Sequence, residues 1–271
     1  MASVTGAGVN DFLNPRTGRA VIVAMDHGIG SGAVRGLEAP GRVLDEVLLG
    51  RPDGVLLGLN LARHLLPRLR GAGVPFWVTL DAYSTSTVPG EHGDLTLHTA
   101  IATPSAARDL GARGVKALLV FGHSDHRQYL DNVRSVALLA EDAHRAGLPI
   151  MVEAVLWGRH IPEARRDHPD SIQHACRMAF ELGADLVKTT RPKRGLEEVV
   201  ASTPVPVLIL GGDRSGDEAG FLRDVATAMA GGARGVVCGR AIWQNPAPAE
   251  IVRALTAVVH DQRPVAEVLG L

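Results

Sequence analysis

Residues Gly183–Thr190, GADLVKTT, join a short apolar run to a lysine, Lys188. A continuous apolar run, without alternation, is typical of a β-strand buried on both faces. Only three of the 28 Lys and Arg residues are lysines. An arginine keeps its proton near neutral pH, whereas a desolvated lysine can lose its proton and attack a carbonyl carbon. The stretch therefore predicts a buried strand ending in a candidate nucleophile; the alternative is a lysine that merely extends from the strand end into solvent.

The same pattern, an apolar run followed by a segment of helical periodicity, occurs eight times. A glycine precedes several of the runs, as expected where a helix ends before a strand. Eight β/α units in 271 residues predict a single (β/α)8 TIM barrel domain over residues 1–271, with an N-terminal lead-in over about residues 1–19. A doubly wound sheet is the alternative, although it more often has five to seven strands. With Ala184–Lys188, the predicted strands are Ala20–Met25, Gly54–Gly58, Phe76–Leu80, Ala117–Phe121, Ile150–Val155, Val205–Leu210 and Gly235–Cys238.

The composition excludes several classes of function. Hydrophobic residues make up 46% of the chain and the net charge is −1, with no basic block for nucleic acid or for a membrane surface. The two cysteines, Cys176 and Cys238, are far apart and indicate no disulfide framework. No run is long enough to span a membrane, and we expect no signal peptide. We expect a cytoplasmic protein that binds neither nucleic acid nor membrane.

In a TIM barrel the active site lies where the strands end. Acidic, imidazole and aromatic side chains follow several predicted strands, and an enzyme site explains the set more simply than separate structural roles do. The loop over about residues 82–98 is long for a compact domain, which favours a function there. The candidate site residues besides Lys188 are Asp26, His27, Asp81, Tyr83, His123, Glu153 and Trp157.

The ends of the seventh and eighth predicted strands suggest a phosphate site. Glycines at Gly211, Gly212 and Gly239 let backbone N–H groups approach an anion, and Arg240 adds a guanidinium. Asp213 belongs to the same segment. Two ordinary glycine turns are the alternative interpretation.

Two further features are interpreted without a catalytic role. His123, Asp125 and His126 would need His27 or Glu153 to complete a metal site, and Lys188 would then have no task, so we expect no metal. Lys116 opens the fourth predicted strand on the wrong face, and we expect both Lys116 and Lys193 to be solvated.

Four segments carry a family resemblance. They are Phe12–Gly28, Gly183–Thr189, Leu210–Gly212 and Gly239–Gln244. Together they resemble the DeoC/LacD-type class I aldolases, in particular the group of archaeal-type fructose-bisphosphate aldolases and 2-amino-3,7-dideoxy-D-threo-hept-6-ulosonate synthases. The resemblance implies a Schiff base on Lys188 without a cofactor, a catalytic carboxylate at Asp26, a substrate phosphate at the glycines and Arg240, and a homo-oligomer.

One segment departs from that family's pattern. Family aldolases often carry a proton-donating tyrosine after the fifth strand, where this chain has Trp157, and an indole cannot donate a proton in this role. Tyr83, His27 or His123 would have to replace it. We therefore expect an aldolase acting on a phosphorylated ketose, with a dihydroxyacetone-phosphate-type donor and an aldehyde, in biosynthesis rather than glycolysis. The alternatives are transaldol or thiolase-like acyl transfer on the same lysine, a metal-dependent aldolase, and a non-catalytic sugar-phosphate binding protein.

Overall fold

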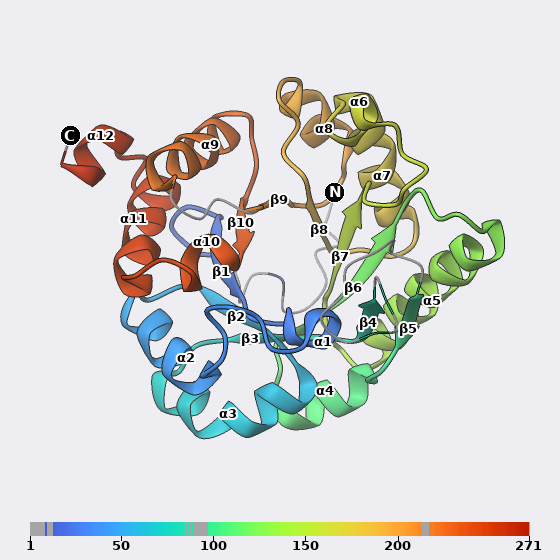
Figure 1. Ribbon diagram of the computed structural model, residues 1–271, viewed down its shortest axis with the longest axis horizontal. Coiled ribbons are helices and arrows are strands. Elements are labelled where there is room, and N and C mark those ends of the chain that lie inside the picture. The colour runs from blue at the N-terminus through green and yellow to red at the C-terminus, as the bar shows by residue number, and fades with distance from the viewer. Residues whose placement is uncertain are drawn as a thin grey trace.

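Eight parallel strands close into a barrel, in the order β1-β10-β9-β8-β7-β6-β3-β2. The computed structural model describes residue 9 and residues 13–84, 86, 88, 97–212 and 217–270. Figure 1 looks down the barrel and shows the helices as a ring outside the strands. The predicted TIM barrel is confirmed. Its strands are β1 Ala20–Ala24, β2 Gly54–Gly58, β3 Phe76–Thr79, β6 Gly114–Val120, β7 Ile150–Val155, β8 Leu186–Thr189, β9 Val207–Leu210 and β10 Gly235–Cys238.

The helices that link the strands pack their apolar faces on the barrel. Helix α3 (Leu59–Ala72) is typical: Ala62, Leu65 and Leu69 are buried, and it ends at Gly73, whose φ of 63° is left-handed. None of the described helices is both long and apolar enough to cross a membrane. The other long helices are α2 Pro40–Leu49, α4 Pro104–Leu110, α5 His126–Arg145, α7 Pro169–Glu181, α8 Leu196–Ser202, α9 Glu218–Ala230 and α11 Pro248–His260. The short ones are α1 Gly28–Ser31, α6 Glu163–Arg166, α10 Arg240–Trp243 and α12 Val265–Leu269.

Successive side chains of each strand face opposite sides, which separates two buried layers. On β8, Val187 belongs to the cluster shared with the helices, whereas Leu186 belongs to the cluster that fills the barrel. Lys188, two residues after Leu186, therefore points into the barrel. The strand register sets Glu153 of β7 directly beside Lys188, so the two side chains point the same way.

The segment after β3 differs from the irregular loop expected over residues 82–98. It forms an antiparallel hairpin of β4 (Asp81–Ser84) and β5 (Leu97–Ala100), which Figure 1 shows beside α1. Residues 85, 87 and 89–96 of this segment lie outside the described residues. The hairpin thus places Tyr83 and the start of the next segment at the end of the barrel where the parallel strands finish.

Candidate active site

Two lysines share one carboxylate inside the barrel. Glu153 Oε1 lies 2.8 Å from Lys188 Nζ, and Glu153 Oε2 lies 3.0 Å from Lys116 Nζ. The three residues come from the adjacent strands β8, β7 and β6, and all are buried. Strand pairing fixes their backbones and so holds the three charged groups in contact.

Asp26 joins this cluster from the end of β1. Its Oδ2 accepts a hydrogen bond of 2.6 Å from the Thr79 hydroxyl and lies 3.5 Å from Lys116 Nζ. Two carboxylates and two ammonium groups therefore meet in the barrel mouth. We call Asp26, Lys116, Glu153 and Lys188 the mouth cluster.

Lys116 corrects the sequence interpretation. It was expected in solvent, but it is 1% exposed and is among the largest fully buried side chains. The predicted fourth strand began at Ala117, whereas β6 begins at Gly114. Lys116 is thus inside the strand, on the same side as Leu118, and faces the barrel. The rarity of lysine in this chain was the signal that could have found it.

The charges of the mouth cluster shift each other's protonation. Burial alone would raise the pKa of Glu153, but Lys116 and Lys188 lower it below its ordinary value. Burial alone would also raise the pKa of Asp26, but Lys116, His27 and Lys188 bring it well below its usual range. Burial alone would lower the pKa of Lys116, whereas Glu153, Asp26 and Asp81 raise it well above its usual range. Both carboxylates are therefore ionised near neutral pH, and Lys116 stays an ammonium.

Lys188 lines a cavity of about 50 Å³, and most of the predicted site residues line it as well. The lining brings together strand ends that are distant in sequence, as the TIM barrel rule requires. Lys116 is not part of this wall. The predicted residues on the wall are His27, Glu153, Trp157, Lys188, Gly211, Gly212, Gly239 and Arg240.

The glycines of the cavity are needed for close packing. A Cβ on Gly211 would meet the Cβ of Cys238, and a Cβ on Gly239 would lie 2.6 Å from a ring carbon of His27. Gly212 has a φ of 63°, in the left-handed region that glycine tolerates. The two turns place the backbone of Gly211, Gly212 and Gly239 on the cavity wall next to Arg240, an arrangement suited to an anion. Asp213 lies outside the described residues.

His27 sits between the cavity and Asp26. Its Nδ1 lies 3.7 Å from Asp26 Oδ1, and its ring packs edge-on against Trp243 at 5.2 Å. Burial lowers the pKa of His27 below its ordinary value, although Asp26 acts in the opposite direction. The imidazole is thus neutral near neutral pH and able to donate or accept a proton.

Tyr83 reaches the same region from the hairpin. Its ring lies 6.4 Å from that of Trp157 and packs with it on the small cluster of Leu118, Val120 and Val155 inside the barrel. Burial raises the pKa of Tyr83 to about 12, with Glu153 and Asp26 adding to the rise. Its hydroxyl therefore keeps its proton and can donate it.

Asp81 and His123 lie outside the cavity wall. Asp81 Oδ2 accepts hydrogen bonds from the Leu118 N–H at 2.6 Å and from His98 at 2.8 Å, which ties the hairpin to β6. The ring of His123 lies 6.3 Å from that of Tyr129 on α5. Burial and the neighbouring His98 lower the pKa of His123. The structure thus places both beside the site and not at Lys188.

The other members of the His-x-Asp-His segment begin a helix. Asp125 caps α5 by accepting a hydrogen bond of 2.8 Å from the Arg127 N–H, and His126 is the first residue of α5. Within the described ranges, no group of three or more His, Cys, Asp or Glu side chains is arranged to hold a metal ion.

Comparison with protein families shows which family contains this chain. Residues 20–245 match the DeoC/LacD family aldolase. The chain belongs to this family. It is an aldolase, and hence a lyase, of the class that forms a Schiff base on a lysine.

Relatives of this aldolase share nearly its whole length. It is 34% identical to the 2-amino-3,7-dideoxy-D-threo-hept-6-ulosonate synthase of Halobacterium salinarum, over 95% of this chain and 94% of the relative. It is 28% identical to the class 1 fructose-bisphosphate aldolase of Thermoproteus tenax, over the whole of both chains. A solved archaeal fructose-1,6-bisphosphate aldolase has 25% identity and a TM-score of 0.77, covering 92% of this chain and 96% of that one; its catalytic lysine is bound to the carbinolamine intermediate of the substrate.

Proposed function

We propose that this aldolase forms or cleaves a carbon–carbon bond in a phosphorylated ketose through a Schiff base on Lys188. The observation that supports it most is the cavity, which joins Lys188 to the glycine turns and Arg240. A ketose phosphate bound with its phosphate at Gly211, Gly212, Gly239 and Arg240 would present its carbonyl to the lysine.

Lys188, and not Lys116, is the proposed nucleophile. Lys188 lines the cavity, whereas Lys116 is fully buried behind it with its pKa raised. An amine attacks a carbonyl only after losing its proton, and Glu153 Oε1, 2.8 Å from Lys188 Nζ, is placed to take it. Lys116 remains an ammonium and contributes a permanent positive charge to the mouth cluster.

The proposed reaction begins with addition of the Lys188 amine to the ketone. A C–N bond forms, the carbonyl electron pair moves to oxygen, and that oxygen takes a proton from the cluster. Loss of water, with proton transfer through Asp26 or Glu153, leaves an iminium ion. The fixed carboxylates compensate the positive charge of this ion in a site from which water is largely excluded.

The carbon–carbon bond then breaks next to the iminium. The hydroxyl of the departing carbon gives its proton to a base, the bonding pair moves into an enamine, and the aldehyde leaves. The enamine carbon takes up a proton, and water hydrolyses the iminium to release the ketone. Synthesis of the bond is the reverse sequence, in which the new hydroxyl must receive a proton.

Tyr83 is the proposed donor and acceptor of that hydroxyl proton. It retains its proton and contacts Trp157, the residue that occupies the family's tyrosine segment. His27 is the second candidate, because it lines the cavity and lies beside Asp26. Neither Tyr83 nor His123 lines the cavity itself, but Tyr83 packs against the lining residue Trp157, whereas His123 packs against Tyr129 on α5 and is therefore the weakest of the three predicted replacements.

A biosynthetic role is supported by the replaced tyrosine segment and by the 34% identity with a relative named as a synthase. Transfer of the enamine to another aldehyde, or acyl transfer, would use the same lysine. Product analysis with dihydroxyacetone phosphate and a set of aldehydes separates condensation from transfer.

We also infer a homo-oligomer, as the resemblance implies.

Reductive trapping tests the function itself. Dihydroxyacetone phosphate and borohydride are added to the wild-type protein and to Lys188→Met, and the intact mass is measured. The wild type should gain the mass of one reduced donor and lose activity, whereas the variant should gain none. Turnover of the donor without any trapped adduct would exclude the Schiff base.

A further inference from the structure

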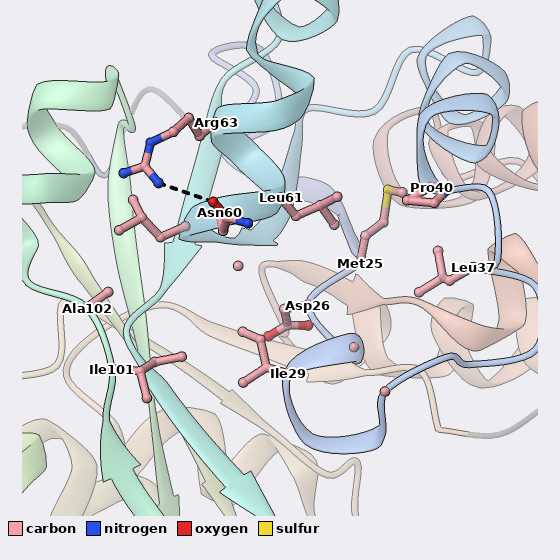
Figure 2. A pocket seen from close by; sticks show the side chains of 14 residues that line it. Met25, Asp26, Ile29, Leu37, Pro40, Asn60, Leu61, Arg63, Ile101 and Ala102 are labelled. Carbon is pink, nitrogen blue, oxygen red and sulfur yellow. Dashed lines mark hydrogen bonds between the residues drawn. The ribbon is translucent and has the colours of Figure 1, made fainter. Parts of the chain in front are cut away.

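A second, larger cavity lies beside Asp26 at the same end of the barrel. It has a volume of about 510 Å³ and is bounded by the segment after β1, the start of α3, and the segment that follows β5. Figure 2 shows Ile29, Leu61 and Ile101 around it, with Asp26 beside Ile29. Its exposed wall is mainly apolar.

Two polar side chains at the rim of this cavity bond to each other and do not cover its apolar wall. Arg63 donates a hydrogen bond of 3.2 Å to the Asn60 side chain, and both residues are exposed at the rim. Ile101 is 51% exposed, although it is a large apolar residue. An exposed apolar side chain at the mouth of an apolar cavity is suited to a ligand with hydrocarbon surface.

The position of the cavity relates it to the proposed reaction. In the barrel order, β2 stands opposite β8, the strand of Lys188, while β9 and β10 with the anion-binding turns lie between them on one side. Asp26 lines the large cavity and is itself a member of the mouth cluster, 3.5 Å from Lys116 Nζ. The two cavities have no described lining residue in common, but Asp26 and Gly28 of the large cavity flank His27 of the small one in the chain. The large cavity is thus the neighbouring space for the other end of a substrate held at its phosphate and at Lys188.

We propose that the large cavity binds the chain of the aldehyde partner, and that this chain is apolar rather than polyhydroxylated. The inference rests on the proposed function and deepens it by naming the class of aldehyde. In the condensation, the enamine carbon on Lys188 bonds to the aldehyde carbon, and the aldehyde oxygen takes the proton of the new hydroxyl. The iminium that results is hydrolysed by water. The aldehyde's hydrocarbon chain lies meanwhile against Ile29 and Leu61.

A hydroxylated chain fits this cavity poorly for a physical reason. Each hydroxyl would lose its bonds to water against an apolar wall, whereas each buried methylene contributes a gain of roughly fourfold in kcat/KM. With dihydroxyacetone phosphate as donor, kcat/KM should therefore rise from ethanal through propanal and butanal to pentanal. Butanal should exceed erythrose, which has the same number of carbons, by about tenfold or more.

Two substitutions test the cavity directly. Ala102→Phe fills it from the segment after β5, and it should lower kcat/KM for butanal and pentanal by about tenfold while leaving ethanal within about twofold. Leu61→Asn keeps the branched shape and the number of side-chain heavy atoms but makes the wall polar, and it should reduce the ratio of kcat/KM for butanal to that for erythrose. Ala164→Phe is the matched control, because exposed Ala164 lies in a different cavity, beyond β7.

The outcomes separate this inference from the function on which it rests. Borohydride trapping of Lys188 with dihydroxyacetone phosphate alone is measured in the same preparations. If the adduct forms but erythrose is preferred, if the aldehyde series is flat, or if Ala102→Phe slows ethanal as much as pentanal, the inference is wrong and the function stands. If no adduct forms, both are wrong. A rising series that Ala102→Phe flattens, and that Leu61→Asn makes less selective against erythrose, supports the proposal.

Discussion

Two polar clusters occupy opposite ends of the barrel, and they differ in kind. The mouth cluster has two lysines and two carboxylates where the strands end. At the end where the strands begin, Asp53 Oδ2 lies 2.8 Å from His260 Nε2, and His260 Nδ1 lies 2.8 Å from the Thr17 hydroxyl. We call Thr17, Asp53 and His260 the base cluster.

In the base cluster a carboxylate, an imidazole and a hydroxyl are linked in series, as they are in a catalytic triad whose hydroxyl is the nucleophile. Its bonds, however, join segments of the fold: Asp53 also accepts a hydrogen bond of 2.6 Å from the Val21 N–H, and His260 ends α11. It lies at the end of a TIM barrel where residues contribute stability. Geometry of hydrogen bonds alone therefore does not identify the catalytic cluster.

The mouth cluster differs by its charges and by its access to a ligand. Burying four charged groups is costly, and an apolar core would stabilise the barrel at least as well. Two of the four, Glu153 and Lys188, line a cavity together with the two glycine turns and Arg240. The fold does not require the charged groups of the mouth cluster, and a ligand can reach two of them. Both facts indicate that these groups have a function.

The largest expected effect is the loss of the nucleophile. Lys188→Met should reduce kcat by about 10⁴-fold or more, because none of the other described residues that line the cavity carries an amine that could form the Schiff base. Glu153 would still be paired with Lys116, so the barrel should keep its fold, which circular dichroism checks. A variant with more than a hundredth of wild-type activity would show that Lys188 is not the nucleophile.

Glu153→Gln should have the next largest effect. It removes the carboxylate between the two lysines and should lower kcat by about 10²–10³-fold. Asp53→Asn is the matched change in the base cluster, and it should lower the free energy of unfolding while kcat of the folded protein stays unchanged. Equal losses of kcat in the two variants would remove the distinction between the clusters.

Tyr83→Phe should lower kcat by about 10²-fold with the ring packing against Trp157 retained. Because the pKa of Tyr83 is raised to about 12, loss of its proton should not limit the rate at moderately alkaline pH. The pH–rate profiles of wild type and variant should thus be parallel up to about pH 10. An unchanged kcat would assign the proton transfer to His27.

His260→Ala should affect stability alone. It leaves Asp53 and Thr17 without their partner and should lower the free energy of unfolding by about 1–3 kcal/mol, measured by urea titration. The kcat of the folded variant should match that of the wild type. A fall in kcat without a fall in stability would mean that the base cluster has a function of its own.

The smallest effect concerns acid stability. Because the pKa of Asp26 is lowered in the folded state, its contribution is present above the unfolded-state pKa of about 3.8 and is lost as the pH falls below that value. The stability of the wild type should therefore fall more steeply below about pH 4 than that of Asp26→Asn, by at most about 1.4 kcal/mol per pH unit. Identical slopes would show that Asp26 is not held ionised by the cluster.

The barrel and much of its site are predictable from sequence. Each of the eight strands is buried on both faces, so each reads as an apolar run, and the fold rule then gathers residues such as Lys188, Glu153 and Gly239 at one end. The two glycine turns proposed to hold the phosphate are also predictable, because their glycines directly follow the seventh and eighth predicted strands.

Three features of the structure cannot be predicted from the sequence in this way. Lys116 is hidden because a charged residue near the start of a strand gives no sign of the side it faces. The β4–β5 hairpin lacks a long apolar run, and the four residues of each strand carry little pattern. The contact of Asp53 with His260 joins positions 207 residues apart, which no local pattern encodes.

The most direct test is to locate the trapped adduct. After borohydride reduction with dihydroxyacetone phosphate, proteolysis and mass spectrometry assign the modified lysine. Lys116 and Lys188 share one carboxylate, but only Lys188 lines the cavity. The account predicts modification of Lys188 and none of Lys116. An adduct on Lys116, or on neither lysine during turnover, would contradict it.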